Sequence, residues 1–363
     1  MQTQLAPQFA DTPEGIEAAR ILGKCVHCGF CTATCPTYQL LGDELDGPRG
    51  RIYLIKQIAE GQAPTEKTRL HLDRCLTCRN CESTCPSGVQ YGNLVDIGRK
   101  WAEDNTSARP IGERLTRWAL KEGLTKPALF NSAMTLGRLV RPLMPSGIQR
   151  KIPLIKNKAL DPQINPYARP KAHHARKMLI LEGCVQPGML PNINSATARV
   201  LDALKIQLLS APSATCCGAL RYHLNDQVGG LDNAKQNIDA WWPMVESGIE
   251  AIIMTASGCG VMVKDYGHLL ANDPAYAAKA KKISELTKDI SEVMASLQNE
   301  LVALIGSDQK SGVVYHPPCT LQHGQQIRGK VESLLGSLGI GVRLCNDSHL
   351  CCGSAGTYSV TQP

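Results

Sequence analysis

Residues 25–36 of the chain read CVHCGFCTATCP, and residues 75–86 read CLTCRNCESTCP. Both runs fit the spacing C-x2-C-x2-C-x3-C-P without a mismatch. Three thiolates at x2 spacing can wrap a loop around one face of an iron–sulfur cubane, and the fourth cysteine, which its proline turns away, reaches the other cluster. The two runs together predict two [4Fe-4S] clusters.

The crossing of the fourth cysteines gives the predicted ligand sets. One cluster is expected on Cys25, Cys28, Cys31 and Cys85, and the other on Cys75, Cys78, Cys81 and Cys35. Zinc and disulfides are the alternatives, but zinc sites use four ligands in pairs, and this run repeated twice is not a usual zinc spacing. His27 lies between two ligands. Because all the cysteine positions are filled, we expect it to be a partly exposed loop residue.

Length and composition limit the class of protein. A chain of 363 residues exceeds the size at which single hydrophobic cores usually stop growing, so about two domains are expected. Its sixteen cysteines are too small a fraction for a secreted disulfide scaffold. The start, MQTQLAPQFADTPEG, lacks the basic-then-apolar run of a secretory signal, so we expect a reducing cytoplasm. No run of 18 or more apolar residues occurs, and the chain is not expected to span a membrane.

The positive charge is concentrated in one segment. Residues 100–177 contain 16 Lys or Arg against 5 Asp or Glu, a local balance of +11 within a total of +7. We expect this segment to dock on a partner or on the anionic face of the cytoplasmic membrane; a solvated basic helix pair is the alternative. Binding to nucleic acid is disfavoured because interleaved aromatic residues are few.

Three regions differ in pattern along the chain. Residues 1–100 carry both cysteine runs and form the predicted two-[4Fe-4S] ferredoxin-type domain. Between the runs, RIYLIKQIAEG has apolar residues at helical spacing (Ile52, Ile55, Ile58 and Ala59), so this domain is expected to be mainly helical. Residues 101–176 hold no cysteine and several prolines, which indicates basic helices joined by loops and then a linker.

Residues 177–363 alternate short apolar runs with helical stretches. The runs are KMLILEGC, IQLLSAP, EAIIMTASGCG, SGVVYHPPC and GVRLCND. Such alternation predicts α/β units around parallel strands. The expected fold class is therefore α+β and α/β, with a mainly helical cluster domain followed by an α/β domain.

The α/β region also repeats itself. Cys184 is followed after 31 residues by Cys216-Cys217-Gly218, and Cys319 is followed after 31 residues by Cys351-Cys352-Gly353. Equal spacing predicts two copies of one unit, repeat one over 177–300 and repeat two over 311–363.

The second copy is expected to be incomplete. In the first copy, 41 residues separate Cys217 from a further cysteine, Cys259, and the same spacing in the second copy leads past Pro363. We therefore expect a shortened version of a longer parent, whose C-terminal unit is poorly packed because a strand is lost from its sheet.

The paired runs, the GPRGR segment between them and the Cys-Cys-Gly repeats resemble the iron–sulfur subunits of four enzyme groups. These are glycolate oxidase, anaerobic glycerol-3-phosphate dehydrogenase, the lactate-utilisation oxidoreductases and heterodisulfide reductase. The resemblance covers Ile21 to the last residue. In LDGPRGRIYLIKQ, HLDRCLTCRNCESTCPSGVQYG and SATCCGAL it is nearest to the bacterial glycolate oxidase iron–sulfur subunits.

The resemblance implies further sites at the Cys-Cys-Gly motifs. One would use Cys184, Cys216, Cys217 and Cys259, and part of another would use Cys319, Cys351 and Cys352. Structural thiols, a zinc site, a further cluster or redox thiols are all open readings of these residues. Cys345 matches neither repeat and is expected to be an ordinary thiol.

Several other motifs have a structural and a functional interpretation. Gly47-Pro48-Arg49-Gly50-Arg51 reads as a turn and helix start, or as arginines whose charge favours the reduced state of a nearby cluster. No flavin or nicotinamide site is evident: the glycines of Gly336–Gly341 are in the wrong order for G-x-G-x-x-G and suit a helix end leading into a strand. His173-His174 is expected in a solvated turn, and Trp241-Trp242 in a packed helix.

The resemblance therefore implies an electron-transfer subunit without catalytic residues of its own. Glycolate would be oxidised to glyoxylate on a flavin-containing partner subunit, and electrons would pass through the two clusters toward a membrane quinone. The alternative is the iron–sulfur subunit of a lactate or glycerol-3-phosphate dehydrogenase, or of a heterodisulfide-reductase-like enzyme. The expected location is the cytoplasm, peripheral to the inner membrane.

Overall fold

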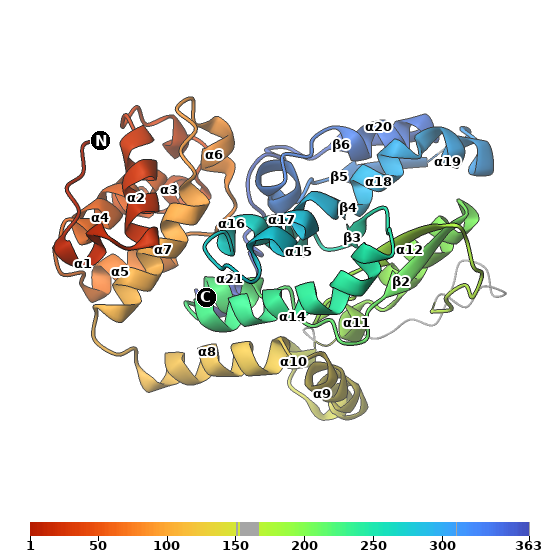
Figure 1. The fold of residues 1–363 in the computed structure, drawn as a ribbon, viewed down its shortest axis with the longest axis horizontal. Helices are drawn as coiled ribbons and strands as arrows, with labels where there is room; N and C mark the ends of the chain where they lie inside the picture. Colours follow the sequence, from red (N-terminus) through yellow and green to blue (C-terminus); the bar gives the residue numbers. More distant parts are fainter. Residues whose placement is uncertain (150–151, 153–166, 310, 363) are drawn as a thin grey trace. The chain divides into compact units, whose positions relative to one another are not determined.

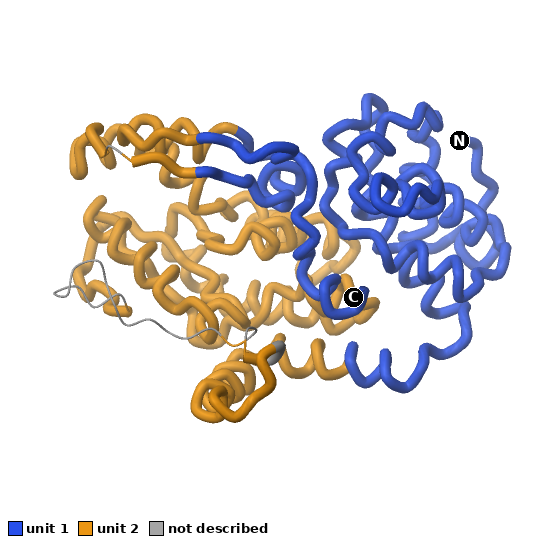
Figure 2. The backbone as a smooth tube through the Cα atoms, turned by 180° about the vertical axis from the view of Figure 1, so that it is seen from behind, with its two compact units in different colours: residues 1–117, 314–328, 343–363 blue, residues 118–313, 329–342 orange. Residues whose placement is uncertain are grey.

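The computed structural model describes residues 1–149, 152, 167–309 and 311–362 (Figure 1). It forms two compact units (Figure 2). Unit 1 comprises residues 1–117, 314–328 and 343–363, and unit 2 comprises residues 118–313 and 329–342. Residues 150–151 and 153–166 of the basic segment lie outside the described residues. In the described ranges, no helix is both long and apolar enough to cross a bilayer.

Unit 1 is mainly helical, which confirms the expectation for the cluster region. Its helices are α1 (Pro7–Ala10), α2 (Pro13–Lys24), α3 (Pro36–Leu41), α4 (Pro48–Ala59), α5 (Glu66–Asp73), α6 (Asn80–Thr84), α7 (Tyr91–Asp104) and α21 (Tyr358–Thr361). Short 3₁₀ turns lie at Phe30–Thr32 and Glu44–Asp46, and a π-helical turn lies at Thr320–Gly324.

The helix predicted between the two cysteine runs is α4. The four apolar residues at helical spacing are all buried in the core of unit 1, together with Leu72 of α5 and Leu94 of α7. Gly47 and Pro48 start this helix, and proline suits a first helical position because the N–H there has no intrahelical partner. Pro36 starts α3 in the same way directly after Cys35.

The basic segment forms the helices that its sequence predicts. These are α8 (Ile111–Leu124), α9 (Pro127–Val140) and α10 (Ser146–Gln149), with a 3₁₀ turn at Arg141–Leu143. Arg109, before α8, is buried and pairs with Asp73 at 2.7 Å and Glu103 at 2.6 Å.

Unit 2 is built around a four-stranded parallel sheet. Its strands are β1 (Arg176–Ile180), β2 (Ile206–Ser210), β3 (Ile252–Met254) and β4 (Thr287–Asp289), in the order β2-β1-β3-β4. The helices that accompany them are α11 (Gln186–Met189), α12 (Asn192–Ala203), α13 (Ala219–His223), α14 (Gln227–Glu246), α15 (Ser257–Lys264), α16 (Tyr266–Leu269), α17 (Ala277–Leu286), α18 (Ile290–Ser296) and α19 (Gln298–Ile305). The first three predicted strands are confirmed as β1, β2 and β3.

A second, two-stranded sheet pairs β5 (Ser311–Tyr315) with β6 (Ile340–Leu344), and α20 (Lys330–Ser337) lies between them in the sequence. Both strands lie at predicted runs. The glycines before β6 mark a helix end: Gly339 has φ of 82°, and a Cβ on it would lie 2.2 Å from the Ser307 carbonyl oxygen. Trp241 is fully buried in α14, as expected for a packed helix.

Candidate metal centres

The two cysteine loops of unit 1 follow the same backbone path. In the first loop His27 and Gly29 have φ of 57° and 86°, and in the second the equivalent Thr77 and Arg79 have φ of 53° and 57°. Such left-handed residues curl each loop around its own cysteines, and the Thr77 N–H donates to Cys75 Sγ at 3.4 Å. Because non-glycine residues adopt this conformation at a cost of about 1–2 kcal/mol, the sites must hold the loops in place.

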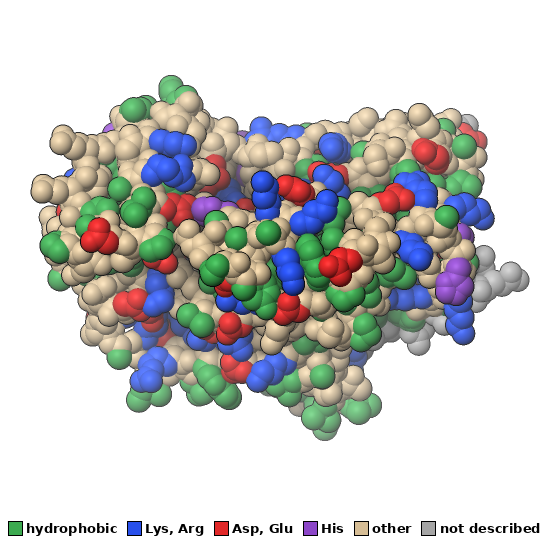
Figure 3. Space-filling model, in the orientation of Figure 1, with side chains coloured by type: hydrophobic (Ala, Val, Ile, Leu, Met, Phe, Trp, Pro, Cys, Tyr) green, Lys and Arg blue, Asp and Glu red, His purple; other side chains and the backbone are tan. Residues whose placement is uncertain are grey.

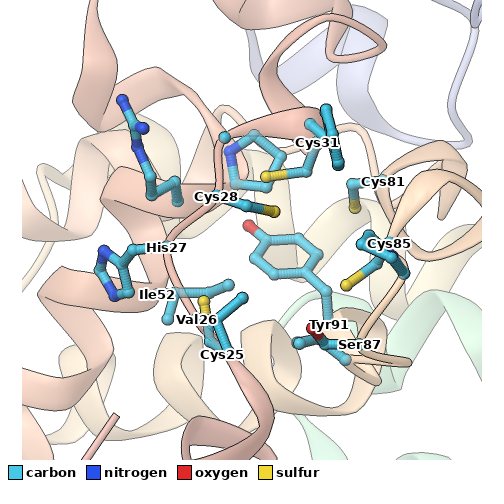
Figure 4. Close-up of a pocket in the computed structure, with 16 residues that line it drawn as sticks. Cys25, Val26, His27, Cys28, Cys31, Ile52, Cys81, Cys85, Ser87 and Tyr91 are labelled. Carbon is cyan, nitrogen blue, oxygen red and sulfur yellow. The ribbon is translucent and has the colours of Figure 1, made fainter.

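The first set of thiols surrounds one open pocket (Figure 4). Cys25, Cys28 and Cys31 line it together with Cys85, which comes from the second run. Its walls are largely apolar and include Val26, Phe30, Ile52, Pro86 and Val89. The structure thus brings together the four cysteines that the spacing assigns to the first cluster.

Crowding of these thiols affects their ionisation. Burial, followed by the neighbouring Cys25 and Cys28, raises the pKa of Cys31 to about 11. Burial, the N-terminal ammonium group and Arg49 lower the pKa of His27, so its imidazole is neutral near pH 7. His27 is partly exposed, as expected, and its Nε2 contacts Met1 Sδ.

The second set lies deeper in unit 1. Cys35, Cys75 and Cys81 are buried, and Cys78 is partly buried. Burial raises the pKa of Cys78 to about 12, and Cys75, Cys351 and Cys35 contribute to the rise. Burial also raises the pKa of Cys81, with contributions from Cys78, Cys75 and Cys35. The fourth cysteine of the first run therefore lies with the second set.

The donors of both sets suit iron–sulfur clusters. Soft thiolates are the ligands of such clusters, and bound iron compensates the mutual repulsion that raises these pKa values. In the described part of the chain, three ligand atoms lie within 4.8 Å of one another only at Asp43, Asp46 and His71. There Asp46 already pairs with Arg51 and Arg74. The cysteine sets are spread more widely, as the larger size of a four-iron cluster requires.

Repeat one brings its four cysteines together in unit 2. Cys184 follows β1, Cys216 and Cys217 follow β2, and Cys259 lies in the first turn of α15 after β3. Because these strands are parallel, all four lie toward the carboxyl edge of the sheet, where ligands of such sheets commonly bind.

The thiols of repeat one are hydrogen-bonded to one another. Bonds from Cys184 and Cys217 lower the pKa of Cys216, whereas bonds to Cys216 and Cys259 raise the pKa of Cys217. Buried side chains fix the backbone here: the Asn237 amide donates to the Cys216 carbonyl at 2.9 Å, and the Tyr266 hydroxyl donates to the Cys217 carbonyl at 2.8 Å. Within this set, Cys216 is therefore the favoured thiolate.

The cysteines of repeat two lie in unit 1. A bond from Cys351 lowers the pKa of Cys319, and Cys351 contributes to the raised pKa of Cys78. Side chains of α6 hold this segment: Asn80 donates to the His349 carbonyl at 2.8 Å, and Ser83 Oγ lies 3.0 Å from His323 Nδ1. Cys352 is exposed, and Cys345 follows β6. The cysteines of the two repeats thus have equal spacing in the sequence but lie in different surroundings in the fold.

Three residues near the second set were not predicted from the sequence. Two of them, Tyr91 and Arg99 of α7, are buried beside the Cys75 loop. The third, Asp46, is buried beside Arg51. A buried position for Tyr91, Leu94 and Val95 could be read from their spacing, but their closeness to Cys75 arises only from packing of α7 on α5 and α4.

Comparison with known proteins agrees with this geometry. Residues 21–89 match the 4Fe-4S dicluster domain, and residues 178–264 and 313–363 match the cysteine-rich domain. The chain is 53% identical over its whole length to the glycolate oxidase iron–sulfur subunit of Escherichia coli K12, of which it covers 86%. No solved structure matches the chain.

More distant relatives are also similar. The chain is 32% identical over 360 residues to the probable glycolate oxidase iron–sulfur subunit of Bacillus subtilis 168; the match covers 93% of this chain and 80% of the relative. Lactate utilization protein A of Bacillus pumilus is 25% identical over 185 residues, which are 51% of this chain and 75% of the relative. By its full-length similarity, its dicluster domain and its cysteine-rich repeats, the chain belongs to the family of glycolate oxidase iron–sulfur subunits, which carry two [4Fe-4S] clusters.

Proposed function

We propose that this chain is the electron-transfer subunit of a flavin-dependent glycolate dehydrogenase. The observation that carries the proposal is the grouping of eight thiols of unit 1 in two crossed sets. We assign Cys25, Cys28, Cys31 and Cys85 to one cluster, and Cys75, Cys78, Cys81 and Cys35 to the other. The names of the two full-length relatives support glycolate as the substrate of the complex.

The residues around the sets suit electron transfer. When bound, each cluster takes up and releases one electron at a time. The thiolates hold the iron, and Val26, Phe30 and Ile52 give the pocket an apolar lining around the sulfurs. Cys81 of the second set also lines the pocket of the first set, so the two sets adjoin.

Oxidation of the substrate belongs, in this proposal, to a flavin on a partner subunit. Glycolate gives up two electrons and two protons to the flavin and becomes glyoxylate. The reduced flavin then supplies electrons singly to this chain, and a membrane quinone is the final acceptor.

The basic segment is the surface that we propose for docking at the cytoplasmic face of the inner membrane. Ile111, Leu115 and Trp118 lie on one face of α8 and are 82%, 61% and 59% exposed. Figure 3 shows hydrophobic side chains gathered over α9, where Leu136 and Leu139 are exposed. Exposed apolar residues within a segment of charge +11 are typical of binding to an anionic lipid surface.

The Cys-Cys-Gly sets are proposed as additional metal or redox sites. Repeat one supplies Cys184, Cys216, Cys217 and Cys259, and repeat two supplies Cys319, Cys351 and Cys352. Zinc or a further cluster fits four gathered thiols, and a favoured thiolate at Cys216 also suits disulfide reduction. A heterodisulfide-reductase-like activity is therefore the second candidate function. Disulfide reduction by the isolated chain, lost in Cys216→Ser, would favour it over the first.

The first proposal is tested with the complex purified from cells that carry single Cys→Ser variants. In Cys28→Ser and in Cys78→Ser, glycolate should still bleach the partner's flavin, whereas quinone reduction should be lost. Cys345→Ser is the matched control and should retain both. Failure of glycolate to bleach the flavin in the two variants would contradict the division of labour. Bleaching by lactate or glycerol 3-phosphate in place of glycolate would identify a related dehydrogenase.

A further inference from the structure

The two cluster sites have the same loop backbone but different charged surroundings. Near the first set, the cations are the N-terminal ammonium group, which donates to the Cys25 carbonyl at 2.8 Å, and Arg49, whose side chain is 36% exposed. Its guanidinium donates twice to the Glu44 carboxylate, at 2.6 and 3.0 Å. The charge of Arg49 is therefore both compensated by a carboxylate and screened by solvent.

Near the second set, the corresponding cation is buried. Arg51 lies two residues after Arg49 on α4, and its side chain is 1% exposed. Its Nη1 donates to Thr37 Oγ1 at 3.2 Å, and this hydroxyl lies 3.3 Å from Cys35 Sγ. The guanidinium is thus connected to one of the four thiols through a single hydroxyl group.

The carboxylate that faces Arg51 is shared between two arginines. Asp46 lies 3.3 Å from Arg51 Nη2 and 3.0 Å from Arg74 Nη1. The Asp43 carboxylate lies within 4.8 Å of Asp46 but is exposed, and Arg74 is partly exposed, so water screens these two charges. Arg51 and Asp46 are removed from water, and the charge of Arg51 acts on the nearby Cys75 and Cys35 thiols with little screening.

A second buried cation comes from α7, which follows the second cysteine loop in the sequence. Arg99 of α7 donates to the Cys75 carbonyl at 2.6 Å and to Thr77 Oγ1 at 3.1 Å. Its carboxylate neighbour, Asp96, is 3.9 Å away. Arg99 therefore holds the Cys75 loop and adds positive charge beside it.

Tyr91 supplies a hydroxyl group to the same site. Its side chain is 3% exposed, and its hydroxyl is buried without a hydrogen-bond partner. This hydroxyl lies beside Cys75. Figure 4 shows the ring among the side chains of Cys25, Cys28, Cys81 and Cys85. A protonated hydroxyl near Cys75 can donate to a thiolate there.

We propose that Arg51, Arg99 and the Tyr91 hydroxyl raise the reduction potential of the second cluster above that of the first. Reduction adds a negative charge, which buried cations and a hydrogen bond to the ligand sulfur stabilise. The inference rests on the two-cluster part of the proposed function. It implies that electrons enter at the Cys25–Cys31 loop and collect at the Cys75–Cys81 loop. Arg51, Arg99 and Tyr91 are thus positioning residues that act through the thiolates.

The test is a redox titration of the purified complex followed by electron paramagnetic resonance. Tyr91→Phe removes only one hydroxyl group, so the fold should persist. It should lower the higher of the two midpoint potentials by about 59 mV, which for one electron is about tenfold in the equilibrium. Arg51→Gln should lower the same potential, and Arg51→Lys should restore most of it.

Controls assign the signals to the two sites. Arg49→Gln, on the same helix, should leave the higher potential unchanged. Cys78→Ser should alter the high-potential signal, and Cys28→Ser the low-potential signal. The inference is overturned if Cys28→Ser alters the high-potential signal, or if Tyr91→Phe leaves both potentials unchanged. An iron content well below the eight atoms of two [4Fe-4S] clusters would instead refute the two-cluster function itself.

Discussion

Gly218→Ala should destabilise unit 2 far more than the equivalent change, Gly353→Ala, destabilises unit 1. Both glycines follow a Cys-Cys pair, and both have left-handed backbones, with φ of 90° and 82°. A Cβ on Gly218 would lie 2.4 Å from the Gly230 carbonyl oxygen, whereas a Cβ on Gly353 meets nothing within 4 Å. The pair therefore separates backbone strain from steric overlap.

The expected sizes follow from these two terms. A left-handed alanine costs about 1–2 kcal/mol, and overpacking against backbone adds about 1–3 kcal/mol. Gly353→Ala should thus lose about 1–2 kcal/mol, and Gly218→Ala about 2–5 kcal/mol. For a unit of roughly 200 residues, each kcal/mol lowers Tm by about 2–4 °C.

Urea-dependent hydrogen exchange measures the loss locally. Amides of β1, β2 and β3 should lose protection in Gly218→Ala, whereas amides of α4 and α7 in unit 1 should not. Alkylation of Cys216 and Cys217 should also become faster in the same variant, since the backbone that buries them shifts. Equal losses for Gly218→Ala and Gly353→Ala would refute the reasoning, because the overlap with Gly230 would then contribute nothing.

Two further predictions concern charge. The first replaces four exposed residues of the basic segment by Glu, namely Arg114, Lys126, Lys171 and Lys177. This change should reduce recovery of the chain on anionic vesicles at low salt. Unchanged recovery on vesicles and unchanged copurification with partners would rule out docking through this segment. Burial raises the pKa of Glu103, but hydrogen bonds from Arg109 lower this pKa on balance. The Glu103–Arg109 pair therefore stabilises the fold above about pH 4.5. This stabilisation disappears as the pH falls through the lower folded-state pKa of Glu103. Glu103→Gln should therefore cost about 1 kcal/mol in urea unfolding at pH 7, and this cost should decrease as the pH falls below 4.5; a pH-independent cost would show that charge is not the cause.

Local sequence patterns predicted the helices and strands that form from neighbouring residues. The apolar period of RIYLIKQIAEG identified α4, and five short apolar runs identified β1, β2, β3, β5 and β6. Strand β4 was missed because Thr287–Asp289 has three residues and no apolar run. Its place in the sheet comes from pairing with β3, which brings Thr287 and Asp289 into the interior.

Long-range packing limited the prediction of the site. The GPRGR segment offered two interpretations. The first is confirmed, because Gly47 and Pro48 start α4. The second stays a prediction, although Arg51 three residues later is buried beside Cys35 and Cys75. The roles of Tyr91 and Arg99 could not be derived, since each lies 16 or more residues from Cys75 in sequence and reaches it only through the packing of α7. Spacing predicted the ligands, whereas packing determines the charge around the predicted ligands.

The two Cys-Cys-Gly sets show the same limit. Equal spacing of 31 residues predicted equivalent sites. In repeat one, the cysteines follow successive parallel strands, so the sheet itself gathers four thiols at one edge. In repeat two, α6 binds the segments that carry Cys319 and Cys351 and places Cys351 beside Cys78 of the second cluster set. Helix α6 also carries Cys81, a proposed ligand of the second cluster. The same helix therefore positions both Cys81 and the pair Cys319 and Cys351. The second repeat therefore adjoins the site at which electrons are proposed to collect, whereas the first forms a separate set within unit 2.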